Sequence, residues 1–265
     1  MRMMSIASGS SGNCIYIGTD QTHILIDDGI SKKRVLEGLK RLDLSMSDID
    51  AILITHEHDD HIRGLGVLER YSVTPIYGTK GVLKYISGNK NLGNMPEGIY
   101  HPIEAGQAFR IKDLEIKTVS VSHDAIDPIA YTFESGNKRA GICTDLGEYS
   151  DRIVEAFSGL NTMLIESNHD KNMLLTGPYP YMLKQRIMGN KGHLSNEDCG
   201  RLLGSVLNDG IEHVFLGHLS KENNFPDLAY ETVRMEINLG DNEYKAEDFD
   251  IKVAGRDAPS DIVTI

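Results

Sequence analysis

The chain has 265 residues and a formal net charge of −12 at pH 7, with 40% hydrophobic and 25% charged residues. This length and composition are ordinary for a soluble globular protein that buries a sizeable core. Its apolar runs are too short for a membrane span, and Met1 to Ser5 lacks the apolar stretch of a secretory signal. The acidic charge argues against a broad nucleic-acid-binding surface but leaves room for a local basic channel.

Short strand-like runs alternate with helical patterns along the N-terminal half. Strands are predicted over Ile15–Ile17, His23–Ile26, Ala51–Ile54 and Thr74–Tyr77. Ser31 is the expected cap of a helix with apolar residues at positions 35, 36, 39 and 42. A further helix is expected from about residue 79.

The second half repeats this alternation. Strands are predicted over Leu114–Val121, Ile129–Glu134, Lys138–Thr144, Met163–Glu166 and His213–Leu216. Helices are predicted over Tyr179–Met188, over Ser195–Val206 with Ser195 as its cap, and from Pro226 onward. Two β-rich halves, each with helices after its strands, indicate an α/β fold of two sheets packed face to face. Because no composition shift marks a boundary, we predict one domain over residues 1–265.

Three widely spaced cysteines form no C-x-x-C pair; they are Cys14, Cys143 and Cys199. An odd and sparse set argues against a disulfide framework and against a thiolate zinc site. We therefore expect buried free thiols in a protein of the reducing cytoplasm.

The densest group of ionisable residues lies directly after the predicted strand Ala51–Ile54. It reads Thr55-His56-Glu57-His58-Asp59-Asp60-His61. A turn there can direct several of these side chains into one pocket, and imidazoles and carboxylates are good ligands for Zn²⁺, Mn²⁺ and Fe. Glu57 and Asp59 alternate with the candidate ligands and are expected to point away. A solvated polar loop is the alternative interpretation.

This cluster is an H-x-H-x-D-H motif, and further candidates follow later strands in order: His123, Asp145 and His218. On these motifs the chain resembles the metallo-β-lactamase superfamily, whose early structural aspartate is matched by Asp27. Asp28 stands where the superfamily usually has a small residue. The resemblance implies an αββα four-layer sandwich, in which two mixed β-sheets pack face to face with helices outside.

The resemblance also implies two divalent metal ions. One takes the ligands His56, His58, His123 and Asp145, and the other takes Asp60, His61, Asp145 and His218. A shared anionic ligand is what a pair of cations needs, and the remaining positions leave room for water and substrate. All donors are nitrogen or oxygen, which permits zinc, manganese or iron without choosing among them.

Within the superfamily, the chain resembles the YycJ/WalJ type of bacterial hydrolase. The resemblance rests on Ser8-Gly9-Ser10-Ser11-Gly12-Asn13, Tyr179-Pro180-Tyr181, Gly192-His193-Leu194-Ser195-Asn196-Glu197 and Gly217-His218-Leu219-Ser220-Lys221-Glu222-Asn223-Asn224. Proteins of this type are cytoplasmic, single-domain 5′-exonucleases on DNA. The resemblance predicts a metal-dependent phosphodiesterase in which a metal-bridging hydroxide, oriented by Asp60, attacks phosphorus.

Three further groups are candidates for contact with substrate. His193 precedes a capped helix, as a histidine facing the scissile phosphate does in related tRNA-processing nucleases. It would bind a phosphate oxygen or protonate the leaving oxygen as a general acid. A capping-region surface histidine is the alternative. In the loop from residue 8 to residue 13, Ser10 and Asn13 are expected to bind phosphate, with a plain turn as the alternative.

The segment from residue 171 to residue 192 is basic and contains no acidic residue. Its cations are Lys171, Lys184, Arg186 and Lys191, and Tyr179 and Tyr181 lie among them. This pairing suits a phosphate track with base stacking, formed here by Tyr179, Lys184 and Arg186. The alternative is an amphipathic helix with a solvated basic face and core tyrosines.

Three other functions compete with a DNA exonuclease. The same fold and ligands serve hydrolysis of a small thioester, lactam or lactone. An RNA-processing nuclease is a second alternative, although residues 146 to 217 leave no room for a large inserted cap domain. A metal-stabilised binding protein with little turnover is disfavoured, because the set of ligands is intact. No membrane partner is expected, and His169 has no assigned role.

Overall fold

The computed structural model describes residues 1–265 and contains two mixed β-sheets of seven strands each. In spatial order, the first consists of β14 (Val263–Thr264), β1 (Arg2–Ala7), β2 (Cys14–Gly18), β3 (His23–Ile26), β4 (Ala51–Leu53), β5 (Ile76–Thr79) and β6 (Tyr100–Ile103). Strands β3 to β6 pair in parallel, and β14, β1, β2 and β3 pair antiparallel.

The second sheet also combines parallel and antiparallel pairs. Its order is β13 (Asp250–Val253), β12 (His213–Gly217), β11 (Thr162–Glu166), β10 (Lys138–Cys143), β9 (Ile129–Ser135), β8 (Leu114–Ser120) and β7 (Ala108–Ile111). Strands β10 to β13 are parallel, whereas β9 pairs antiparallel with β10 and β7 with β8. Two mixed sheets confirm the predicted α/β class.

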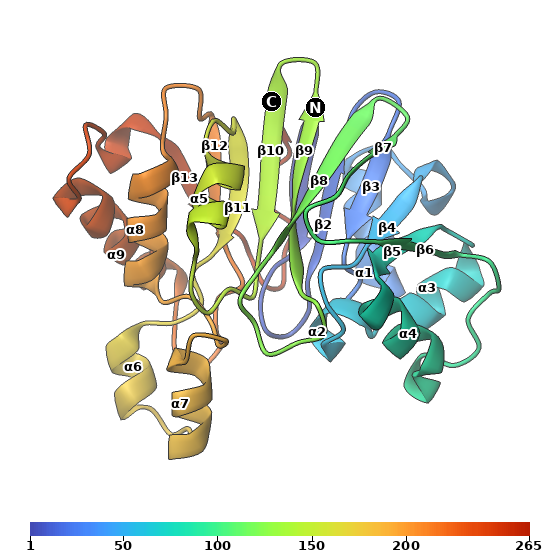
Figure 1. The fold of residues 1–265 in the computed structure, drawn as a ribbon, viewed down its shortest axis with the longest axis horizontal. Helices are drawn as coiled ribbons and strands as arrows, with labels where there is room; N and C mark the ends of the chain where they lie inside the picture. The colour runs from blue at the N-terminus through green and yellow to red at the C-terminus, as the bar shows by residue number, and fades with distance from the viewer. The chain divides into compact units, whose positions relative to one another are not determined.

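Nine α-helices and three short 3₁₀ helices connect these strands (Figure 1). The α-helices are α1 (Lys32–Arg41), α2 (Asp59–Ile62), α3 (Leu65–Tyr71), α4 (Lys80–Gly88), α5 (Asp151–Phe157), α6 (Lys171–Thr176), α7 (Tyr181–Met188), α8 (Asn196–Val206) and α9 (Pro226–Leu239). The 3₁₀ helices are η1 (Met46–Asp48), η2 (Lys90–Leu92) and η3 (Ala246–Asp248). None of these helices is long and apolar enough to cross a membrane.

The chain divides into two compact units. Unit 1 comprises residues 1–118, 125–129 and 255–264, and unit 2 comprises residues 119–124, 130–254 and 265. Each unit has its own buried apolar core. That the two work as one domain over residues 1–265 stays a prediction.

Local sequence accounts for the main elements of both cores. In unit 1, α1 buries Val35 and Leu39, which lie four residues apart on one helix face. In unit 2, α8 buries Cys199, Leu202, Leu203 and Val206, and its Ser195 side chain accepts the backbone N–H of Asp198 as predicted. By contrast, Ser31 stands at the N-cap of α1 without a side-chain capping hydrogen bond. All three cysteines are buried free thiols, as expected.

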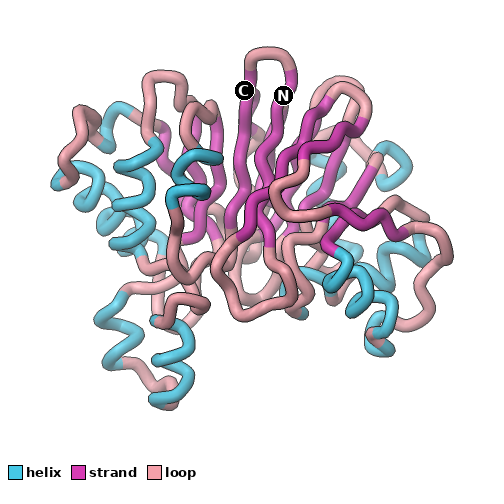
Figure 2. The backbone as a smooth tube through the Cα atoms, in the orientation of Figure 1, coloured by secondary structure: helices cyan, strands magenta, loops and turns pink.

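Helices α6 and α7 form a pair of short helices within unit 2 (Figure 2). Helix α7 has no buried residue, and Tyr181 and Met182 on it are 71% and 76% exposed. The predicted core role of Tyr181, which was the alternative to base stacking, is therefore wrong: its ring lies at the surface.

Candidate active site

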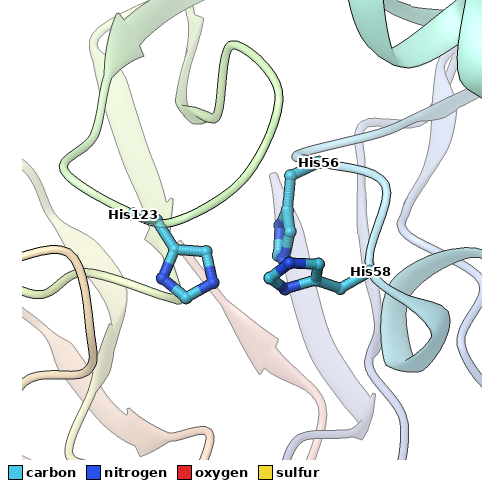
Figure 3. A group of neighbouring side chains, drawn as sticks. All are labelled: His56, His58 and His123. Atoms are coloured by element: carbon cyan, nitrogen blue, oxygen red, sulfur yellow. The ribbon is translucent and has the colours of Figure 1, made fainter. Parts of the chain in front are cut away.

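In unit 1, three histidines gather on the loop after β4 and on α2. The ring of His56 meets that of His58 edge-on, with centroids 4.6 Å apart, and its centroid lies 4.1 Å from that of His61. Figure 3 draws His56 and His58 on this loop, together with His123 of unit 2. His56 and His61 are buried, and Asp60 is half-buried beside His61. Close packing of buried imidazoles beside a carboxylate is typical of metal ligands.

Asp27, directly after β3, orients this group. Its carboxylate accepts hydrogen bonds from Nδ1 of His61 at 2.7 Å and from the hydroxyl and backbone N–H of Thr55, both at 2.9 Å. A histidine that donates Nδ1–H to a carboxylate keeps the lone pair of Nε2 for a metal. The structural position predicted for Asp27, behind the histidines, is the one it occupies.

The turn after Asp27 brings two backbones into close approach. A Cβ atom added to Gly29 would lie 1.6 Å from the carbonyl oxygen of Asp60, so only glycine fits there. The preceding Asp28 is fully buried, and its backbone N–H donates to the carbonyl of His61. Burial raises the pKa of Asp28 well above its usual range, and the nearby Glu69 and Asp27 raise it further. The backbone of Asp28 is thus hydrogen-bonded to α2, while its carboxylate lies buried.

In unit 2, the buried carboxylate of Glu166 organises two histidines. Its Oε1 accepts hydrogen bonds from Nδ1 of His193 and from Nδ1 of His218, both at 2.8 Å. Its Oε2 accepts the backbone N–H groups of Leu146 at 2.6 Å and Leu194 at 3.2 Å. Glu166 is the functional residue that the sequence interpretation missed. The available signal was a carboxylate at the end of the apolar run Met163–Ile165.

The charges of this group stabilise one another. Burial opposes the ionisation of Glu166, but the adjacent His193 and His218 outweigh it and lower the pKa of Glu166 to about 2. Burial likewise opposes protonation of His193, but Glu166 and Asp145 outweigh it and raise the pKa of His193 above its usual value. The pair therefore favours an imidazolium beside a carboxylate. Around them, Asp145, Glu166, His193 and His218 bring donor atoms within 4.8 Å of one another.

His123 belongs to the same unit and is held by the turn after α7. Its Nδ1 lies 2.9 Å from the carbonyl oxygen of Gly192, and its Nε2 lies 3.6 Å from Oδ1 of Asp145. The neighbouring Ser122 donates its hydroxyl to the carbonyl of Asn190 at 2.8 Å. Burial lowers the pKa of His123, which favours the neutral imidazole that binds metals.

Three residues of these groups have left-handed backbones within two residues of a strand end. The φ angles are 59° for Asp27 after β3, 57° for Asp145 after β10 and 55° for His218 after β12. Residues other than glycine adopt this conformation rarely, and strained backbone clusters at functional sites. The strain turns each side chain sharply off the end of its strand.

The candidate substrate-binding residues occupy varied environments. Ser10 is exposed, whereas Asn13 is fully buried, where its amide nitrogen lies 3.0 Å from Nε2 of His61 and its Oδ1 accepts the backbone N–H of Gly9. In the basic segment, Lys184 donates to the carbonyl of Leu175 at 2.7 Å, and Arg186 forms an ion pair with Asp124 at 2.5 Å.

The other residues of the basic segment also differ in exposure and in whether they have a partner. Lys171 pairs with Asp198 at 2.9 Å, Lys191 is exposed and Tyr179 is half-buried. Three of the four cations of the basic segment thus already have partners within unit 2.

The family model for the beta-lactamase superfamily domain matches residues 22–218. The chain therefore belongs to the metallo-β-lactamase superfamily, and it is a metal-dependent hydrolase whose His and Asp clusters are suited to metal binding. It is 39% identical over 227 residues to "Exodeoxyribonuclease YycJ" of Bacillus anthracis, covering 84% of each chain. It is also 39% identical over 236 residues to "Exodeoxyribonuclease WalJ" of Streptococcus pneumoniae, covering 89% of this chain and 88% of the relative.

Solved structures agree on the fold. The Zn²⁺-bound PqqB of Methylobacterium extorquens matches over 100% of both chains with a TM-score of 0.73 and 15% identity. At that identity the likeness shows the fold alone, and it confirms the predicted metallo-β-lactamase fold class. The predicted resemblance to the YycJ/WalJ type is confirmed by the two relatives above.

Proposed function

We propose that this protein is a cytoplasmic phosphodiesterase that degrades DNA as a 5′-exonuclease. The substrate class is supported by the two exodeoxyribonucleases that share 39% identity with most of the chain. The observation that carries the chemistry is the position of His193: its Nδ1 lies 2.8 Å from the buried carboxylate of Glu166, in one group with Asp145 and His218. A proton donor at the leaving oxygen of a phosphodiester typically contributes ~10²–10⁴-fold to the rate.

We further propose two divalent metal ions, of zinc, manganese or iron. One is held by His56, His58, His123 and Asp145, and the other by Asp60, His61, Asp145 and His218. Support comes from the imidazole and carboxylate donors in each unit, and from the carboxylates that orient Nδ1 of His61 and of His218. When bound, such metals lower the pKa of water to about 7 and polarise a phosphoryl oxygen.

The chain's own residues then have separate tasks. Asp60 orients the attacking water through its carboxylate. His193, with Nδ1 fixed on Glu166, offers the proton on Nε2 to the leaving oxygen. The phosphates and bases on either side of the scissile phosphate are contacted by five further residues: Ser10, Asn13, Tyr179, Lys184 and Arg186. For Arg186, phosphate has to compete with Asp124.

The proposal is tested by incubating the metal-loaded protein with single- and double-stranded DNA and RNA labelled at either end, alongside a thioester substrate. We expect DNA to be shortened from its 5′ end, so a 5′ label is released first. Preferential turnover of the thioester would move the assignment to a small-molecule hydrolase, and preferential cleavage of RNA would move it to an RNA-processing nuclease.

A further inference from the structure

Unit 1 contains a hollow beside α4 and η2. None of the motifs predicted from the sequence contributes residues to it. Its volume is about 510 Å³, within the ~300–1,000 Å³ range of small-molecule sites. Two glycines, Gly81 and Gly88, contribute to its lining without side chains. The side chains that line it are those of Lys84, Tyr85, Asn89, Lys90, Asn91 and Ile126.

The charge of this hollow is positive in an otherwise acidic protein. Residues 80 to 96 contain three lysines and no acidic residue. Lys80 pairs with Glu104 at 3.2 Å, but Lys84 and Lys90 are exposed and form no ion pair. No carboxylate lines the hollow, although the carboxylate of Asp127 lies beside the lining residue Gly81. Two unpaired ammonium groups at one concave surface suit phosphate oxygens.

The uncharged lining suits a base. Tyr85 is 43% exposed, although it lies on a helix that buries Val82, Leu83 and Ile86. An exposed aromatic ring offers a stacking surface to any base. Asn89 accepts the backbone N–H of Asn91 through Oδ1 at 3.0 Å, which leaves its amide N–H groups to donate. Amide side chains of this kind pair with the edges of bases.

One wall of the hollow is attached to the loop that carries the histidines. The backbone N–H of Ile126 donates to both carboxylate oxygens of Glu57, at 3.1 and 3.0 Å. Glu57 stands between His56 and His58 in the sequence, and Ile129 donates its N–H to the carbonyl of Thr55 at 3.1 Å. Hydrogen bonds therefore fix the position of Ile126 relative to the histidine loop within unit 1.

We propose that this hollow is a nucleotide subsite for single-stranded nucleic acid. Tyr85 stacks on one base, Lys84 and Lys90 bind the phosphates on either side of it, and Ile126 closes the wall on the side of the histidine loop. The inference rests on the proposed nuclease function and deepens it, because it assigns binding of the strand beyond the scissile phosphate to α4 and η2. Glu57 is a positioning residue that connects this subsite to the loop.

The test is the binding of a fluorescein-labelled 12-nucleotide DNA strand to the full chain, titrated over a range of salt concentrations. The double variant Lys84→Ala, Lys90→Ala should flatten the slope of log K against log salt by about 1.4, since each phosphate contact on a single strand accounts for ~0.7. Tyr85→Ala should weaken binding by roughly 5- to 150-fold at fixed salt.

Two controls make the result specific. Lys33→Ala, Lys40→Ala removes the same charge from the exposed face of α1 and should leave the slope unchanged. Hydrolysis of bis(p-nitrophenyl) phosphate should be the same in all variants, because that substrate does not extend to the subsite. If the α4 variants bind the strand as the wild type does, the subsite is refuted even where DNA is still degraded.

Failure of the proposed function has a different signature. If the wild type neither binds nor shortens the strand but hydrolyses a thioester, the nuclease proposal fails and the subsite fails with it. If Lys33→Ala, Lys40→Ala flattens the slope as much as the α4 variant does, the effect is one of net charge, and the hollow has no specific role.

Discussion

Oε1 of Glu166 accepts a hydrogen bond from Nδ1 of His193 at 2.8 Å, with the carboxylate fully buried behind the ring. The same oxygen accepts a hydrogen bond from Nδ1 of His218 at the same distance, so a single carboxylate holds a proton on Nδ1 of both rings. Because Glu166 is also tied to the backbone of Leu146 and Leu194, it cannot turn away without breaking two more hydrogen bonds. Four hydrogen bonds therefore hold this side chain in place.

Replacing Glu166 with Gln should lower turnover by roughly 10–100-fold, the usual cost of removing a group that orients a ligand. The carboxylate raises the pKa of His193, so without it burial lowers that pKa. A general acid must be protonated, and the alkaline limb of the pH–rate profile should therefore move to lower pH. Glu155→Gln, on the exposed face of α5, is the matched control. An unmoved alkaline limb would show that His193 is not the group that titrates there.

Replacing His193 with Ala should lower turnover by ~10²–10⁴-fold while the content of bound metal stays that of the wild type. The reason is that His193 is assigned to the leaving oxygen rather than to a metal. Metal analysis of the purified variant decides between the roles. His213→Ala, which removes a histidine bonded to Asp250 at the start of β12, is the control. Loss of metal from the His193 variant would instead make it a ligand.

Two metal ions per chain are expected, separated by about 4 Å in a metal-loaded crystal. Asp145→Asn should lower the content of both, because its carboxylate is the proposed shared ligand, whereas His123→Ala should lower one. A chelator should also destabilise the wild type, by about 2.7 kcal/mol for a metal present at 100 times its dissociation constant. Thermal unfolding with and without chelator measures this. A single equivalent of metal in the wild type contradicts the dinuclear centre.

The double variant Lys184→Ala, Arg186→Ala should weaken oligonucleotide binding and flatten its salt dependence, while sparing a small chromogenic phosphodiester. The expected change in the slope is smaller than the loss of two phosphate contacts would give. The reason is that Leu175 and Asp124, the partners of these side chains, compete with phosphate. Salt titrations beside the α4 variants allow a direct comparison. If long and small substrates are degraded as by the wild type, the segment is a solvated surface.

His169 is expected to make stability pH-dependent. It is 2% exposed, and burial lowers its pKa to about 4. The folded chain therefore holds His169 neutral at pH values where the unfolded chain, with a pKa of about 6.5, binds a proton. The free energy of unfolding is therefore unaffected by this group above about pH 6.5. As the pH falls from about 6.5 toward 4, protonation of the unfolded chain lowers that free energy by up to about 3 kcal/mol. Urea unfolding of His169→Gln across this range should show a shallower loss than the wild type. Parallel curves would contradict the assignment.

The sequence is most informative where function is encoded in adjacent residues. His56, His58, Asp60 and His61 are neighbours because a single turn after β4 presents them, so their motif is visible without a structure. Long apolar runs likewise predict the central strands, since strands buried on both faces carry continuous apolar side chains. The elements that were not predicted are strands β1, β6, β7, β13 and β14 and helices α2, α3, α5 and α6, and these are mostly short or mixed in polarity.

The sequence by itself thus determined the superfamily, the α/β class and the candidate ligands, because motif spacing and strand polarity are local properties. Only the tertiary structure decided that Glu166 bonds to both His193 and His218, since these three residues come from three separate segments. It also showed that Lys184 and Arg186 already have partners, while Lys84 and Lys90 stay unpaired beside Tyr85. The sequence shows which side chains are charged. Whether a lysine or arginine is already paired depends on which distant carboxylate the fold brings next to it.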